Sequence, residues 1–135
     1  MSKHPVFSLP VRVYFQDTDA GGVVYHASYV NFMERARTEW LRTHGYSNAG
    51  LIKEFGVVFV VRSLKLEYLK PALLDDMLDV TAQIKDIGRS RLTLLQTVRR
   101  KEELLTEAET HLVCVSLASF KPVAVPEVLR VQLEK

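Results

Sequence analysis

Hydrophobic and polar residues alternate along most of this chain, and a period of two predicts β-strands. In "FSLPVRVYF", residues 7–15, the apolar Val11, Val13 and Phe15 occupy one side of the alternation. Further stretches of strand type follow at residues 57–69, 77–87, 91–103 and 105–120. The connections between them are short, which favours antiparallel neighbours. The pattern therefore predicts five strands in an antiparallel sheet.

One segment has the period of a helix instead, from Ser28 to His44. Its apolar residues recur at spacings of three and four and form a single face: Tyr29, Phe32, Met33, Ala36, Trp40 and Leu41. Gly45 follows as a C-terminal stop signal. Residues 47–56 are predicted to be a loop with one short helical turn at most, and residues 125–135 a short closing helix with Pro126 in its first turn.

The order of these elements predicts a fold of the α+β class. A helix with one apolar face and a sheet with one apolar side must bury each other, so the helix is expected to lie across a curved sheet. At this length, residues 1–135 are expected to form one domain. A single helix covers only a strip of five strands, so we expect the outer strands to pair or pack with another subunit, in a homodimer at least.

Composition narrows the class of function. The formal net charge is only +2 and no basic stripe is present, which argues against a nucleic-acid partner. No signal peptide opens the chain, and no apolar run approaches the ~20 residues of a membrane span, so we expect a cytoplasmic protein without an integral membrane segment.

The reactive side chains outside one motif show no arrangement typical of a metal or redox site. The single Cys114 lies in an apolar run and is expected to be buried without a disulfide. His4, His44 and His111 have no metal-ligand spacing with one another or with Cys114. We therefore expect neither a metal nor another cofactor.

The motif is "QDTDAGGVVYHASY", residues 16–29, which places Asp17, Asp19 and His26 around Gly21 and Gly22 just before the helix. Asp, Thr and Gly are ordinary turn residues, so a plain strand-to-helix connection is one interpretation. The other is an active-site loop. A helix N-terminus offers free N–H groups and a favourable dipole to a developing oxyanion, and the glycines leave space beside the backbone.

Beyond this motif, "ERARTEWL", "FVVRSLKLEYLKPALLDDML" and "EAETHLVCV" also carry a family likeness. Together with "DTDAGGVVYHASY" they resemble the 4-hydroxybenzoyl-CoA thioesterase-like branch of hotdog proteins. The sequence is most similar to the acyl-CoA thioesterases associated with the Tol–Pal system. The resemblance covers nearly the whole chain. It implies a hotdog fold, hydrolysis of an acyl-CoA to a free acid and CoA, and a homotetramer.

The resemblance also implies roles for residues. The second acid of the motif, Asp19, corresponds to the catalytic base or nucleophile, and the oxyanion donor is a backbone N–H at Tyr25 or His26. The His26 side chain is carried over as a substrate-side contact or as a group that tunes the pKa of Asp19. Asp17 is interpreted as a turn residue that supports this substrate loop.

Basic residues are expected to bind the phosphates of CoA. The resemblance suggests Arg89, and Arg91 is a further candidate because it lies in the same hairpin. Three alternatives stay open. Glu34 on the helix could serve as the base. The protein could be a hotdog dehydratase or hydratase that uses His26 with Glu34. It could also be a non-catalytic protein that holds an acyl-CoA, an acyl carrier protein or an envelope-assembly partner. Acyl chain preference is not determined.

Overall fold

The computed structural model describes residues 4–135; the first three residues of the predicted domain 1–135 lie outside the described part. In chain order the elements are β1 (Phe7–Arg12), the 3-10 turn η1 (Phe15–Asp17), α1 (His26–Thr43), α2 (Asn48–Phe55), β2 (Val57–Tyr68), β3 (Met77–Ile87), β4 (Arg91–Arg100), β5 (Glu103–Ser116) and α3 (Glu127–Leu133).

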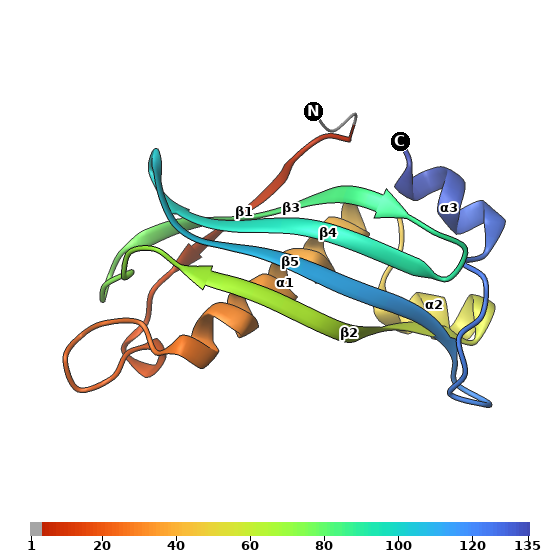
Figure 1. Cartoon of the computed structure of the whole chain (residues 1–135), viewed down its shortest axis with the longest axis horizontal. Helices are drawn as coiled ribbons and strands as arrows, with labels where there is room; N and C mark the ends of the chain where they lie inside the picture. Colours follow the sequence, from red (N-terminus) through yellow and green to blue (C-terminus); the bar gives the residue numbers. More distant parts are fainter. Residues whose placement is uncertain (1–3) are drawn as a thin grey trace.

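All described strands belong to one antiparallel sheet with the order β1-β3-β4-β5-β2. Strands β3, β4 and β5 follow one another through short turns, and β1 and β2 form the two edges. Helix α1 lies across one face of the sheet, against β1, β3 and β4 (Figure 1). The predicted α+β hotdog arrangement, a long helix on a five-stranded antiparallel sheet, is confirmed.

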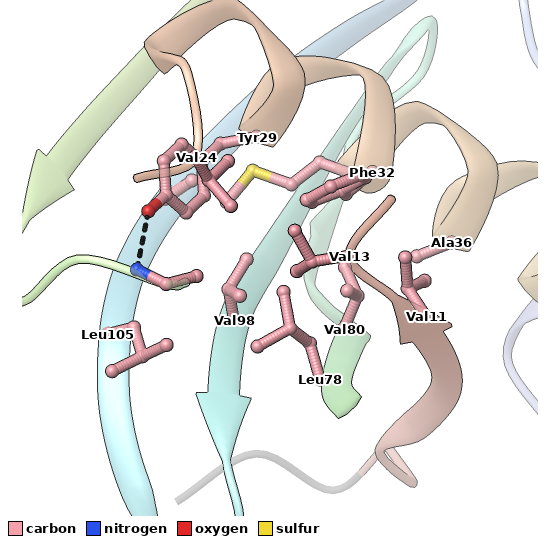
Figure 2. Packing of buried hydrophobic residues seen from close by; sticks show 13 residues of the cluster. Val11, Val13, Val24, Tyr29, Phe32, Ala36, Leu78, Val80, Val98 and Leu105 are labelled. Carbon is pink, nitrogen blue, oxygen red and sulfur yellow. Dashed lines mark hydrogen bonds between the residues drawn. The ribbon is translucent and has the colours of Figure 1, made fainter. Parts of the chain in front are cut away.

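The apolar face of α1 provides the centre of the core. Near the start of the helix, Tyr29, Phe32 and Ala36 pack against Val80 and Val98 of the sheet (Figure 2). Near its end, Trp40 and Leu41 belong to a second cluster that also contains residues of α2 and α3. Each predicted apolar position of the helix is buried, because the whole stripe lies against other elements.

Two predicted boundaries at the start of the chain are wrong. The strand predicted for residues 7–15 ends at Arg12, and Phe15 is 79% exposed. The chain turns there into η1, because the N–H of Tyr14 bonds the Asp17 carboxylate instead of a strand. The helix predicted from Ser28 begins at His26, so the last four residues of the motif, 26–29, lie in its first turn.

The segment predicted as a loop with one short turn, residues 47–56, is instead the eight-residue helix α2. Ser47 caps it by accepting a hydrogen bond from the N–H of Gly50 at 2.9 Å. Gly56 ends it with a φ of 66°, a left-handed conformation that favours glycine. The short length hid this helix, although the N-cap and the terminal glycine were both readable signals.

Other boundaries agree more closely. The short closing helix is confirmed as α3, which begins directly after Pro126. The stretches predicted at 91–103 and 105–120 end earlier, at Arg100 and Ser116, because turns follow. Cys114 is buried, as predicted. In the part of the chain that is described, no helix has the length and apolar character needed to cross a membrane.

A buried hydrogen bond joins α1 to the segment between β2 and β3. The backbone N–H of Ala72 donates to the hydroxyl oxygen of Tyr29 over 3.0 Å, as the dashed line in Figure 2 shows. Tyr29 is only 2% exposed and Ala72 is fully buried. Burial raises the pKa of the Tyr29 phenol above its ordinary value.

We expect Tyr29→Phe to lower the free energy of unfolding by about 1–3 kcal/mol, because the N–H of Ala72 would stay buried without an acceptor. Urea unfolding followed by circular dichroism measures this. The matched control is Tyr46→Phe, because the hydroxyl of Tyr46 makes no hydrogen bond within residues 4–135. Equal losses in both variants would contradict the role given to this bond.

Candidate active site

The loop between β1 and α1 is closed by Asp17, which is 9% exposed. Its carboxylate accepts a hydrogen bond from the N–H of Tyr14 at 2.8 Å. Its backbone carbonyl accepts bonds from the N–H of Tyr25 at 2.8 Å and from the hydroxyl of Ser28 at 3.2 Å. Asp17 therefore connects both ends of the loop, in agreement with its interpretation as a turn residue.

Asp19 lies on a tight turn in the middle of this loop. Its carbonyl accepts from the N–H of Gly22 at 3.1 Å, and its carboxylate accepts from the N–H of Gly21 at 2.9 Å. Gly22 has a φ of 78°, which a side chain would strain. A Cβ atom at Gly21 would lie 3.4 Å from the Asp19 carboxylate. The two glycines thus shape the turn that exposes the carboxylate to solvent.

The segment between β2 and β3 supports this turn from the other side. The N–H of Val24 donates to the carbonyl of Ala72 at 2.9 Å, and the N–H of Leu74 donates to the carbonyl of Gly22 at 3.0 Å. Both bonds join backbone to backbone, so they restrict the loop whatever the side chains do. The position of Asp19 relative to the helix therefore depends on a segment about fifty residues later in the sequence.

That later segment is itself held by Arg100 of β4. The guanidinium donates to the Asp76 carboxylate at 2.7 Å and to the Pro71 carbonyl at 3.3 Å, and it pairs with Glu103 at 2.7 Å. The same Asp76 carboxylate accepts from the N–H of Leu73 at 2.8 Å. The hydrogen bond to Asp76, followed by that to Glu103, raises the pKa of Arg100. The ion pair fixes the shape of the supporting segment.

The first turn of α1 contains backbone donors that the protein does not use. The N–H of Tyr25 is bound to Asp17, and the N–H of Ser28 donates to the carbonyl of Tyr25 at 2.9 Å. Within residues 4–135, the N–H groups of His26 and Ala27 have no acceptor. Of the two predicted oxyanion donors, the geometry therefore leaves His26 available and Tyr25 occupied.

The His26 side chain is exposed and lies against Tyr68 of β2, with ring centroids 4.7 Å apart. The Tyr68 hydroxyl also donates to the His26 carbonyl at 3.3 Å. Both rings line a small pocket of about 200 Å³ that also contains Tyr29. Asp19 does not line this pocket, so one chain alone does not bring Asp19 and the His26 ring to one cavity.

Arg89 and Arg91 lie in and beside the hairpin that joins β3 to β4. This hairpin and the Asp19 loop occupy opposite ends of the molecule (Figure 1). Arg91 lines a separate pocket of about 220 Å³ on which Arg62 and His111 also border. The structure therefore does not bring the predicted CoA-binding arginines to Asp19 within one chain.

Glu34, the alternative base, borders a cavity of about 320 Å³ between α1 and β2. The cavity also contains Arg37, whose side chain bonds Gln96. Glu34 follows His26 by eight residues, which corresponds to roughly 12 Å along a helix. The pairing of His26 with Glu34 that a dehydratase needs is therefore absent within one chain. The described residues contain no cluster able to hold a metal ion.

Two contacts at these sites could not be predicted from the sequence. Tyr68 alternates with Leu64 and Leu66 along β2, and nothing in that pattern indicates its contact with His26. The bond between Arg37 and Gln96 joins residues 59 positions apart. Gln96 is a polar residue on the side of β4 where the other alternating positions are apolar, and that interruption was the one available signal.

Comparison with known proteins gives a consistent family. Residues 13–133 match the thioesterase-like superfamily. The acyl-CoA thioester hydrolase YbgC of Escherichia coli O6:H1 is 51% identical over 123 residues, covering 90% of this chain and 91% of the relative. The acyl-CoA thioesterase YbgC of Haemophilus influenzae is 45% identical over 121 residues, covering 90% and 89%.

A solved structure agrees with these sequences. The crystal structure of a probable thioesterase from Bartonella henselae superposes with a TM-score of 0.86 at 32% identity, covering 90% of this chain and all of that one. The hotdog fold and the family predicted from the motif are thereby confirmed. The chain belongs to the thioesterase-like superfamily, among the acyl-CoA thioesterases of the YbgC type.

Proposed function

We propose that this protein hydrolyses acyl-CoA thioesters with Asp19 as the catalytic carboxylate and the N–H of His26 as the oxyanion donor. The observation that carries the proposal is the glycine turn, which presents an exposed carboxylate one short segment before a helix start with unused N–H groups. The relatives named YbgC are acyl-CoA thioester hydrolases, which supports the reaction class.

In this mechanism, attack on the thioester carbonyl carbon places negative charge on its oxygen. The N–H of His26 and the positive end of the α1 dipole stabilise that charge. Asp19 either removes a proton from the attacking water or attacks the carbon itself to give an anhydride that water then opens. In both routes the carbon–sulfur bond breaks, CoA leaves as the thiolate, and water supplies the hydroxyl of the acid.

The active assembly in this proposal is a dimer formed along β2. The other edge strand, β1, contains Pro10, which lacks the N–H that pairing needs. The twelve-residue β2 has no such block, and its Val60 and Val61 are exposed although apolar. A long apolar edge of this kind is stabilised by a second copy, and a higher oligomer such as a tetramer would be built from such pairs.

Antiparallel pairing of two β2 strands would also complete the site. Tyr68, at the end of β2, lies beside the loop, whereas Val57, at its start, lies at the hairpin end of the sheet. A two-fold axis reverses the second chain, so its Asp19 loop would approach the α1–β2 cavity and the Arg89 hairpin of the first. The arginines could then bind CoA phosphates. The buried, unpaired Cys114 fits the reducing cytoplasm, where we place this activity.

We expect Asp19→Asn to lower the turnover of acyl-CoA by at least about a hundredfold, because it removes the base or nucleophile. The release of CoA from short-chain, long-chain and aromatic acyl-CoAs, followed with a thiol reagent, measures this. Asp79→Asn, an exposed aspartate on β3, is the matched control and should retain activity.

Asp17→Asn distinguishes the structural role of Asp17 in the loop from the catalytic role proposed for Asp19. It should lower the melting temperature because it weakens the bond to Tyr14, whereas Asp19→Asn should leave the melting temperature unchanged. Full activity in Asp19→Asn together with loss in His26→Ala would favour a dehydratase arrangement. Tight acyl-CoA binding by the wild type without CoA release would favour a binding protein.

We expect Val61→Lys to convert the dimer to a monomer, because it places a charge on the pairing edge of β2. Light scattering after size-exclusion chromatography measures the mass. Val128→Lys on α3 is the control, because Val128 is also exposed and apolar but lies far from β2 in sequence. A monomeric wild type, or an undisturbed dimer in Val61→Lys, would refute pairing along β2.

A further inference from the structure

The cavity between α1 and β2 contains a cation that the reaction described above does not use. Trp40 of α1, Phe59 of β2 and Leu112 of β5 form apolar walls, and Arg37 reaches into the cavity from the helix. Burial lowers the pKa of the Arg37 guanidinium, and the charge of nearby Glu34 opposes that effect. A volume of about 320 Å³ lies within the range of small-molecule pockets.

Arg37 lacks a close counter-ion. Within residues 4–135, no carboxylate oxygen lies within 4 Å of its nitrogens, although ion pairs of that length form elsewhere on the surface. Its side-chain bond goes to the neutral Oε1 of Gln96 at 3.1 Å. A guanidinium has five N–H donors, so most of them stay available to a group inside the cavity. A partly desolvated cation without an anion is costly unless another group binds it.

Gln96 holds that cation in a defined place. It is fully buried in β4, and its Nε2 donates to the carbonyls of Met33 at 3.0 Å and Thr81 at 3.3 Å. Its Oε1 also accepts from the hydroxyl of Thr110 at 2.9 Å. With both ends of the amide bound, the oxygen that bonds Arg37 cannot rotate away. A preorganised donor of this kind favours ligands that supply an oxygen acceptor.

We propose that this cavity receives the acyl group of the substrate and that Arg37 selects acyl groups with an oxygen at their far end, a carboxylate or a hydroxyl. The inference rests on the proposed function, in which the two-fold pair brings the Asp19 loop of one copy to this cavity of the other. The thioester then lies at the loop, the carbon chain lies between Trp40 and Phe59, and the terminal oxygen accepts from Arg37. Glu34, which also borders the cavity, can accept a hydrogen bond from a terminal hydroxyl.

The test compares three acyl-CoAs of equal chain length: adipyl-CoA with a terminal carboxylate, 6-hydroxyhexanoyl-CoA with a terminal hydroxyl, and hexanoyl-CoA with neither. For the wild type we expect kcat/KM to be at least about tenfold higher for one or both oxygenated substrates than for hexanoyl-CoA, because a charge-assisted hydrogen bond adds to their binding. The oxygenated substrate with the larger increase in kcat/KM over hexanoyl-CoA identifies the carboxylate or the hydroxyl as the preferred terminal group.

Arg37→Met keeps an unbranched stem about as long as the arginine side chain up to Nε and removes the guanidinium donors. We expect it to lower kcat/KM for the preferred oxygenated substrate by about ten- to a hundredfold and to leave hexanoyl-CoA within about twofold. Arg37→Lys, which keeps the charge without the planar fork, should fall between the two. The matched control is Arg35→Met, an exposed arginine on the same helix that does not border the cavity and should change nothing.

Three results would overturn the inference. They are a wild type that hydrolyses hexanoyl-CoA as well as the oxygenated substrates, an equal loss on all three in Arg37→Met, and an Arg37→Met variant that keeps the wild-type preference. If Arg37→Met does not fold, the wild-type preference decides. Activity on hexanoyl-CoA alone would refute this inference and leave the thioesterase proposal standing, whereas no activity on any acyl-CoA would refute the latter.

Discussion

The burial of one face of α1 on the sheet is the constraint on which the rest of the structure depends. The helix has a single apolar stripe, and that stripe is covered by β1, β3 and β4 together with the short helices at its end. Strand β2 therefore receives little cover from α1, and its apolar Val60 and Val61 remain exposed. The same geometry leaves the cavity between α1 and β2 open. The exposed apolar edge of β2 and the cavity thus have one origin, which is the width of a single helix.

Around the start of α1, structure and proposed chemistry are divided between two aspartates two positions apart. Asp17 is buried, and its carboxylate and carbonyl accept three hydrogen bonds that close the loop. Asp19 is exposed, and its turn is held by two hydrogen bonds, from the N–H of Val24 to the carbonyl of Ala72 and from the N–H of Leu74 to the carbonyl of Gly22. Because those bonds join backbone atoms, the Asp19 side chain contributes little to holding the loop. Its carboxylate is therefore available for the proposed catalytic role.

The sequence predicted what depends on local period and composition. The strands, the helix face from Tyr29 to Leu41 and the motif all follow from short-range patterns, and the family likeness then identified the fold and the reaction class. The prediction from sequence failed where a competing local hydrogen bond determined the backbone conformation. The strand predicted to Phe15 ends at Arg12 because Asp17 binds the N–H of Tyr14, and α2 was missed because eight residues give a weak period. The choice between Tyr25 and His26 as the available oxyanion donor also depended on a local hydrogen bond, from the N–H of Tyr25 to the carbonyl of Asp17.

Contacts between segments far apart in the sequence could not be predicted from local sequence patterns. The polar contacts among them carry the most information about the ligand of the cavity. Gln96 could be noticed as a polar residue on the apolar side of a strand, but its partners Met33, Arg37 and Thr110 come from a helix and another strand. A protein that only needed to fill this space could have used apolar residues at Gln96 and at its side-chain partners, since replacing both members of a buried hydrogen bond by apolar groups of the same shape can be nearly neutral. The hydrogen bonds of the Gln96 amide all serve, directly or indirectly, to hold the partly buried Arg37 guanidinium at the cavity. This amide is therefore better explained by a ligand that enters the cavity than by the stability of the fold.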